Sequence, residues 1–516
     1  MLSCGGPRGA RAGPPVVLRT GRAVACQNVR GTIPPIAPPP ERAGAASSLA
    51  SRFSTIPSPL RHYSPVGLGG QCTGAECFLL RPVDPRRGNR RILYDVNNRG
   101  NKLALWTFND GERSNDPRTL AHAGDGFLLR EGYSLLWSGW NGEVVEDGQQ
   151  RLLAGLPVAT KNGETITGPA HLEIVTTEKV FSRAFSWSPW GISDAFPAGS
   201  GKGMFNYRFR MSTEYGTYHE GMLSGSEFFP LAPVPQTDPV TGETGDTLAR
   251  ARAAEHVPRM MFVQSSTEYW NRAASLLHTD AQGKTDLELP PEVRVYLVAG
   301  AQHLGTGPHT RSICQQPRSI LDDRGPILRA LLVALDRWVS DGAEPPLSRY
   351  PRIDDGTLVS LETFRRQFPS IAGVNLPEAY YQPARLDFGP RFHTEGIAEV
   401  IPPTMGPRYR TLVPAVDADG NDLAGIRLPE VAVPLGTFTG WNLRAAPFGA
   451  GGKLSRLDGM YLPFARTRPQ RQQPGDPRPA VDERYPTRAD YLARITEAAL
   501  RTTRRLRPRT ANAASS

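Results

Sequence analysis

Two titratable side chains in this sequence, Glu268 and His303, each follow a short run of apolar residues. Residues 260–263 (Met-Met-Phe-Val) and 293–298 (Val-Arg-Val-Tyr-Leu-Val) predict buried strands, because parallel strands covered on both faces lose the polar alternation of exposed ones. A neutral imidazole takes the proton of a nucleophile and returns it to the leaving group, while a carboxylate behind it fixes the ring tautomer. The spacing therefore predicts an acid and a base for nucleophilic catalysis.

Both residues also have a simpler interpretation. A glutamate just after a strand commonly caps the helix that follows, and residues 269–277 have a helical pattern. A histidine after a strand is often only a polar loop residue. Spacing alone leaves the structural and the catalytic interpretations open, because short motifs occur by chance.

The elements that must hold this pair form a repeated pattern of strand, loop and helix between residues 76 and 340. A strand over 91–96, a helix over 121–131 and a strand over 133–137 predict a right-handed parallel crossover. We predict an α/β fold, with one mostly parallel sheet and helices on both faces. Its neighbouring strands are expected at residues 91–96, 133–137, 260–263 and 293–298.

The remaining segments are expected to flank this domain. An amphipathic helix over residues 327–339 packs on the sheet, with apolar residues at helical spacing. A proline-rich extension, residues 341–516, packs on the domain and ends in a basic helix over 487–507. Residues 417–422 (Asp-Ala-Asp-Gly-Asn-Asp) suggest a calcium loop at first, but the glycine is at the fourth position and no glutamate is at the twelfth. We predict a hairpin turn there.

The net charge of +10 is concentrated at the two ends of the chain. Residues 1–75 hold eight arginines and one glutamate, and residues 466–516 hold twelve arginines and five acidic residues. The region between them is net negative, so we expect no nucleic-acid interface on the folded part. Nor does any apolar run approach the roughly 18 residues that a membrane span needs.

The N-terminal 75 residues are rich in Arg, Pro, Gly and Ser and predict disorder. Their composition is closer to an organellar transit peptide than to a secretory signal, which needs a continuous apolar core. Order is expected to begin near Glu76.

Five cysteines are too few for a disulfide scaffold, and no Cys/His spacing matches a zinc site. We predict no metal and no cofactor. Whether Cys72 and Cys77 form a disulfide is left open. Residues 70–74 (Gly-Gln-Cys-Thr-Gly) have the form of a nucleophile elbow, but they precede the first predicted strand instead of joining a buried strand to a helix.

Several longer stretches carry a family likeness: RPVDPRRGNRRILYDVNNRGNK, LLREGYSLLWSGWNGE, GKGMFNYRFR, SSTEYWNRAASLLHTD, VRVYLVAGAQH, DADGNDLAGIRLPEVAVPLGTFTGWNLR and YLPFARTRPQR. In this order, over about residues 76–500, they resemble the alpha/beta hydrolase domain family, a branch of the α/β-hydrolase superfamily. GTFTGWNLR is long enough to be specific.

The resemblance implies a serine hydrolase that acts on esters and is often exported, which would place the protein outside the cytoplasm or in the periplasm. By the matching motifs, Glu268 would be the triad acid and His303 the base. The loop after the strand over 91–96 would supply an oxyanion-hole amide, with Asn98 and Arg99 as the candidates.

A nucleophile is missing from this arrangement. It should lie between Trp140 and Met260 in a Gly-x-Ser-x-Gly turn, and only Ser193, in Gly-Ile-Ser-Asp-Ala, comes near that pattern. Pro197 and Gly199 follow where a helix should begin. Relatives carry a longer segment here with the elbow and its flanking strands and helices, so a central strand of the sheet is expected to be absent.

Two classes of function follow. The first is an ester hydrolase with acid and base present but no clear serine nucleophile. The second is a non-catalytic relative that binds a small ester or apolar ligand in the former pocket, and an incomplete gene model would explain the gap equally well.

Overall fold

The computed structural model describes the following residues: 63–72, 75–96, 108–109, 124–139, 145–147, 150–152, 160–161, 164–165, 186–188, 229–249, 252, 257–303, 311–319, 321, 325–387, 389–390, 400, 404–448, 450–455, 458–472 and 475–506. The chain divides into two compact units, whose described parts lie within residues 63–165 and 186–506.

The first unit contains a four-stranded sheet in the order β1-β2-β4-β3. β1 (Tyr63–Cys72) and β2 (Ala75–Pro82) are antiparallel, as are β2 and β4 (Ser134–Gly139), whereas β3 (Ile92–Val96) runs parallel to β4. The helix α3 (Phe127–Arg130) lies between β3 and β4 in the chain and buries two leucines. The parallel crossover predicted for this region is therefore present, with a shorter helix than expected.

The prediction of disorder over residues 1–75 is wrong at its C-terminal end. Residues 63–72 form β1, because their backbone groups pair with β2 from Tyr63↔Pro82 to Leu68↔Cys77. Composition did not reveal this strand, since its pairing partner lies beyond the segment. Residues 1–62 lie outside the described residues.

The second unit contains a three-stranded parallel sheet in the order β13-β12-β9. β12 (Met260–Ser265) pairs with β13 (Val293–Val298) along its whole length and with the short β9 (Ser186–Ser188) on its other edge. Every residue of β12 is buried. This burial explains why neither strand shows a polar alternation in the sequence.

The prediction of one sheet for all four strands is wrong for the described residues. β3 and β4 belong to the sheet of the first unit, and β12 and β13 belong to that of the second.

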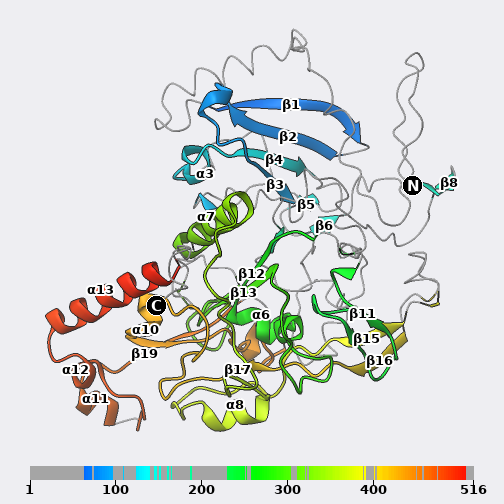
Figure 1. Cartoon of the computed structure of the whole chain (residues 1–516). Helices are drawn as coiled ribbons and strands as arrows, with labels where there is room; N and C mark the ends of the chain where they lie inside the picture. The colour runs from blue at the N-terminus through cyan, green and yellow to red at the C-terminus, as the bar shows by residue number, and fades with distance from the viewer. Residues whose placement is uncertain are drawn as a thin grey trace, which may run out of the picture. The chain divides into compact units, whose positions relative to one another are not determined.

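Helices and turns next to this sheet fix the strand ends (Figure 1). The helices α6 (Ser266–Asn271) and η7 (Ala274–Leu277) follow β12 in the chain, and every residue of both is buried. α6 lies against β12 (Figure 1). α7 (Gly325–Asp341) contacts β12, and its buried residues include the predicted stripe Leu328, Leu331, Leu332, Leu335 and Trp338. Arg294 of β13 stacks on the Trp338 ring at 4.8 Å.

The C-terminal extension is built of short paired strands and helices. The strand pairs are β14 (Leu358–Val359) with β17 (Val413–Pro414), β15 (Ala384–Asp387) with β16 (Thr404–Arg408), and β18 (Gly436–Phe438) with β19 (Tyr461–Pro463). The helices are α8 (Leu361–Gln367), α10 (Pro429–Ala432), η8 (Ala446–Phe448), α11 (Arg468–Gln472), α12 (Val481–Arg484) and α13 (Arg488–Arg505). α13 confirms the predicted final basic helix and packs against α10 (Figure 1).

Smaller elements complete the described structure. They are η4 (Pro85–Arg87) and the hairpins β5 (Val145–Asp147) with β6 (Gln150–Leu152), β7 (Thr160–Lys161) with β8 (Glu164–Thr165), and β10 (Gln236–Thr237) with β11 (Thr244–Gly245). Among the described helices, none has both the length and the apolar character needed to cross a membrane.

The turn predicted over residues 417–422 is present. Val416 and Asp422 form an antiparallel bridge, and the Asp417 carboxylate accepts the backbone N–H groups of Asp419 and Asn421, both at 3.0 Å. Gly420, between them, has a φ of +80°, which favours glycine. The first carboxylate of the supposed calcium loop is thus engaged in closing the turn.

Candidate active site

Glu268 is placed by the turn from strand to helix at the end of β12. Ser265 ends the strand, and Glu268 is the third residue of α6. One carboxylate oxygen, Oε2, accepts the Ser265 backbone N–H at 2.6 Å and also contacts the Ser265 hydroxyl. Glu268 therefore performs the capping role that the simpler interpretation gave it, and this capping fixes the direction of its side chain.

His303 is placed by the turn that follows β13. Its Nδ1 contacts the second carboxylate oxygen of Glu268, Oε1, and both side chains are buried, with exposed fractions of 5% and 0%. The expected hydrogen-bond contact between the two residues is thus present. The two oxygens of one carboxylate serve different groups, so the capping and the imidazole contact do not compete.

This geometry determines which ring nitrogen can act as a base. When Nδ1–H donates to the carboxylate, Nε2 is the nitrogen that carries the lone pair. The carboxylate also stabilises the ring when it is protonated, and burial strengthens that effect because little water screens it. Nε2 is therefore the ring nitrogen that is able to accept a proton.

The turn that carries His303 is fixed by its neighbour Gln302, which is also buried. The Gln302 amide donates to the Ser319 carbonyl at 3.0 Å, and its oxygen accepts the Gly459 N–H at 3.1 Å. Gly459 has no space for a side chain, because an added Cβ would lie 2.0 Å from the Thr439 carbonyl oxygen. Hydrogen bonds of Gln302 with Ser319 and Gly459 therefore fix the backbone next to His303.

A second buried carboxylate, that of Asp422, lies at the ends of the same two strands. Its Oδ2 contacts the Ser266 hydroxyl and accepts the Gly300 N–H at 2.8 Å, and the same N–H also points to Ser266 Oγ at 2.8 Å. Burial raises the pKa of Asp422 to about 6, against the opposing effect of these hydrogen bonds. Sequence reasoning noted Asp422 only as part of a turn.

A model of one protein family, described as an alpha/beta hydrolase domain, matches residues 198–512. The chain belongs to the alpha/beta hydrolase domain family. The resemblance inferred from the sequence is thereby confirmed at the level of the family. No curated protein and no solved structure matches the chain.

The matched region of this alpha/beta hydrolase chain contains Glu268, His303 and Asp422. The other predicted site residues, Ser193 and the oxyanion candidates Asn98 and Arg99, precede it and lie outside the described residues. Their roles stay predictions.

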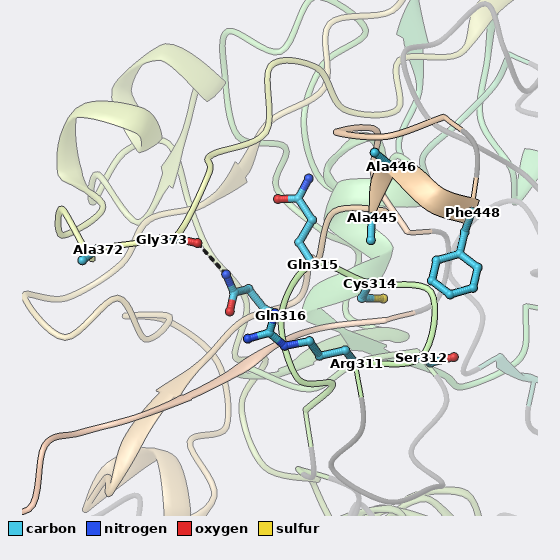
Figure 2. A pocket seen from close by; sticks show the side chains of 10 residues that line it. All are labelled: Arg311, Ser312, Cys314, Gln315, Gln316, Ala372, Gly373, Ala445, Ala446 and Phe448. Atoms are coloured by element: carbon cyan, nitrogen blue, oxygen red, sulfur yellow. Dashed lines mark hydrogen bonds between the residues drawn. The ribbon is translucent and has the colours of Figure 1, made fainter.

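One cavity of the alpha/beta hydrolase chain, of about 640 Å³, is lined by Arg311, Ser312, Cys314, Gln315, Gln316, Ala372, Gly373, Ala445, Ala446 and Phe448. Figure 2 shows Gln316 pointing across it, where its amide donates to the Gly373 carbonyl at 2.7 Å. Burial raises the pKa of the Cys314 thiol to about 12, with the nearby Asp458 carboxylate adding to the effect, so this thiol is not a ready nucleophile. Neither Glu268 nor His303 lines this cavity.

The raised pKa of Asp422 leads to a prediction about stability and pH. Because its carboxyl holds a proton more tightly in the folded than in the unfolded state, the stabilisation is full below the ordinary pKa of 3.8 and is lost as the pH rises through about 6. Asp422→Asn removes this titration. We therefore expect the unfolding free energy of the wild type to fall, relative to the variant, by about 2–3 kcal/mol between pH 4 and pH 7.

Urea unfolding of both proteins at several pH values measures this difference. A difference in unfolding free energy between wild type and variant that stays constant across these pH values would contradict the prediction.

Proposed function

We propose that this chain carries the acid and base of an ester-hydrolysing site, with His303 as the general base and Glu268 as the carboxylate that orients it. The single observation that carries the proposal is the buried contact between His303 Nδ1 and Glu268 Oε1 at the ends of two adjacent parallel strands. Membership of the alpha/beta hydrolase domain family supports the reaction class.

In the proposed reaction, His303 Nε2 takes the proton of an attacking hydroxyl as the hydroxyl oxygen bonds to the ester carbon. The carboxylate of Glu268 stabilises the imidazolium that forms, and the ring returns its proton to the leaving alcohol as the ester C–O bond breaks. The same ring then takes a proton from water, which attacks the acyl group and releases it as the acid while the proton returns to the hydroxyl oxygen.

The nucleophile limits what this chain can do. Ser193 is the nearest match to an elbow, and it lacks the second glycine and is followed by Pro197 and Gly199. The amide after the nucleophile normally supplies half of the oxyanion hole, so loss of the elbow removes both the nucleophile and this amide. We propose that the chain is at most a very weak esterase.

A second candidate function is binding of a small ester or apolar ligand without chemistry. The absence of a Gly-x-Ser-x-Gly sequence between Trp140 and Met260 favours it. An acid and a base that are held in place but have nothing to activate would then be retained from a catalytic relative.

Serine-directed labelling tests whether the chain as written has a working nucleophile. We expect a fluorophosphonate probe to leave the purified protein unlabelled, and His303→Ala to leave the slow hydrolysis of a p-nitrophenyl ester unchanged, because the base has no nucleophile to activate. An active protein of the same fold class, labelled in parallel, is the control for the probe. Mass spectrometry of tryptic peptides locates any modified serine.

Stoichiometric labelling at Ser193 or Ser200 that is lost in His303→Ala would contradict this expectation and show a remodelled elbow. Sequencing the transcript across the codons for residues 190–205 tests the other explanation. If the transcript encodes an additional Gly-x-Ser-x-Gly segment, the longer protein should be labelled and active.

A further inference from the structure

Asp422 belongs to the C-terminal extension, yet its carboxylate lies where β12 and β13 end. The last paired residues of the two strands are Ser265 and Val298. Beyond them the chain enters α6 on one side and the turn toward His303 on the other. Asp422 Oδ2 reaches both, through the Ser266 hydroxyl and the Gly300 amide.

Apart from the contact between Glu268 and His303, few hydrogen bonds join the two segments at this point among the described residues. Within the described part of the chain, the backbone hydrogen bond between them, from Thr267 N–H to the Ala301 carbonyl, is long at 3.4 Å. Ser266 Oγ and Gly300 N are 2.8 Å apart, and Asp422 binds both. Asp422, Ser266 and Gly300 therefore form one hydrogen-bonded cluster just beyond the last paired residues of β12 and β13.

The extension holds Asp422 firmly in this position. Ile426 donates its N–H to the Leu297 carbonyl at 2.7 Å and accepts from Ala299 N–H at 3.0 Å, so this segment continues the pairing on the free edge of β13. Gly425 permits the close approach, because a Cβ there would lie 2.6 Å from the Leu297 oxygen. On the other side, Asn421 accepts the Phe438 N–H at 2.8 Å.

The two groups that Asp422 holds are close in the chain to the proposed acid and base. Ser266 lies in the same helical turn as Glu268, and the turn at Gly300, with a φ of +70°, leads directly to His303. A shift of either segment would therefore separate the Glu268 carboxylate from the imidazole. Small displacements of this kind weaken a catalytic arrangement strongly.

We propose that Asp422 is a positioning residue for the Glu268–His303 pair: by binding the Ser266 hydroxyl and the Gly300 amide together, it fixes the helix that carries the acid against the turn that carries the base. The proposal rests on the proposed function for the role of the pair. It assigns to the C-terminal extension a part in setting the geometry of the site.

The test observes the imidazole directly and needs no turnover. In protein with ¹⁵N-labelled histidine, the strongly hydrogen-bonded Nδ1 proton of His303 gives a deshielded resonance that disappears in His303→Ala. We expect Ser266→Ala and Asp422→Ala to move this resonance upfield and to speed its exchange with water by at least about tenfold, a loosening of about 1.4 kcal/mol. Asp422→Asn, which keeps an oxygen acceptor, should largely restore it.

Ser275→Ala is the matched control. Ser275 is also a buried serine whose hydroxyl oxygen accepts a backbone N–H, from Leu412 at 3.0 Å. Among the described residues it makes no hydrogen bond to Asp422, Ser266 or Gly300. This variant should leave the resonance unchanged.

The proposal is overturned if Ser266→Ala folds and keeps the wild-type resonance and exchange rate, or if Ser275→Ala changes them equally. Ser266→Ala decides the matter even if Asp422→Ala does not fold. Failure of the proposed function would look different: a longer protein with a Gly-x-Ser-x-Gly segment would hydrolyse no ester, while the resonance would still respond to Ser266→Ala.

Discussion

Replacing Trp270 with alanine is expected to lower the unfolding free energy by about 3–5 kcal/mol, the range for removing a large aromatic side chain from a packed core. Trp270 is buried, with 1% of its surface exposed. Its ring meets Phe364 edge to face at 4.8 Å and lies 5.8 Å from the ring of Trp441. The extension cannot fill the resulting cavity, because its backbone is fixed on the same helix: Tyr381 donates its N–H to the Trp270 carbonyl at 2.9 Å.

Urea unfolding followed by circular dichroism measures the change. Phe448→Ala is the control, because Phe448 is 52% exposed and its loss leaves no buried cavity. A change in Trp270→Ala no larger than that in Phe448→Ala would show that the extension does not pack on α6 as described. Trp270 is two residues from Glu268, so the same variant should also loosen the Glu268–His303 contact.

Asp238→Ala is expected to lower the unfolding free energy by a similar amount, about 3–5 kcal/mol, because it leaves a buried guanidinium without its carboxylate partner. The Asp238 carboxylate binds Arg385 through two hydrogen bonds, of 2.6 Å to Nε and 2.8 Å to Nη2, and the side chains are 0% and 7% exposed. The Arg385 guanidinium also stacks on the Tyr409 ring at 4.0 Å. The ion pair thus joins the turn after β10 to the β15–β16 hairpin.

Thermal unfolding of Asp238→Ala beside Glu362→Ala tests this prediction. Glu362 pairs with Arg366 on the exposed face of α8, with side chains 83% and 62% exposed. Exposed ion pairs of this kind add little to the unfolding free energy. Burial raises the pKa of Asp238, but hydrogen bonds from Arg385 and Val240 outweigh this and hold it below its ordinary value. The contribution of the pair is therefore present above pH 3.8 and lost as the pH falls further. Equal effects of the two substitutions would contradict the prediction.

Elements with a strong local pattern were predictable from the sequence. β12 and β13 follow from uninterrupted apolar runs, and α7 follows from leucines at helical spacing. The contact between Glu268 and His303 was predictable for a related reason. The ends of adjacent parallel strands lie at the same edge of a sheet, so residues just beyond them meet.

Elements whose stability comes from distant partners were not predictable. β1 lies in a segment of low-complexity composition and forms because β2 pairs with it. The division into two sheets depends on which strands are present to pair, and no single strand sequence encodes it. Local propensity is a weak guide where pairing across the chain supplies the free energy.

The sequence by itself determined the family, the places of Glu268 and His303 just beyond two strands, and the absence of a Gly-x-Ser-x-Gly sequence between Trp140 and Met260, because each depends on residue types at short spacing. Only the tertiary structure decided that Asp422, 122 residues beyond Gly300, binds at the ends of β12 and β13. The same holds for the aromatic rings of the extension that pack on Trp270. Such contacts are stabilised by burial and by satisfied hydrogen bonds, and they form only once the intervening chain has folded and its loop-closure entropy has been offset.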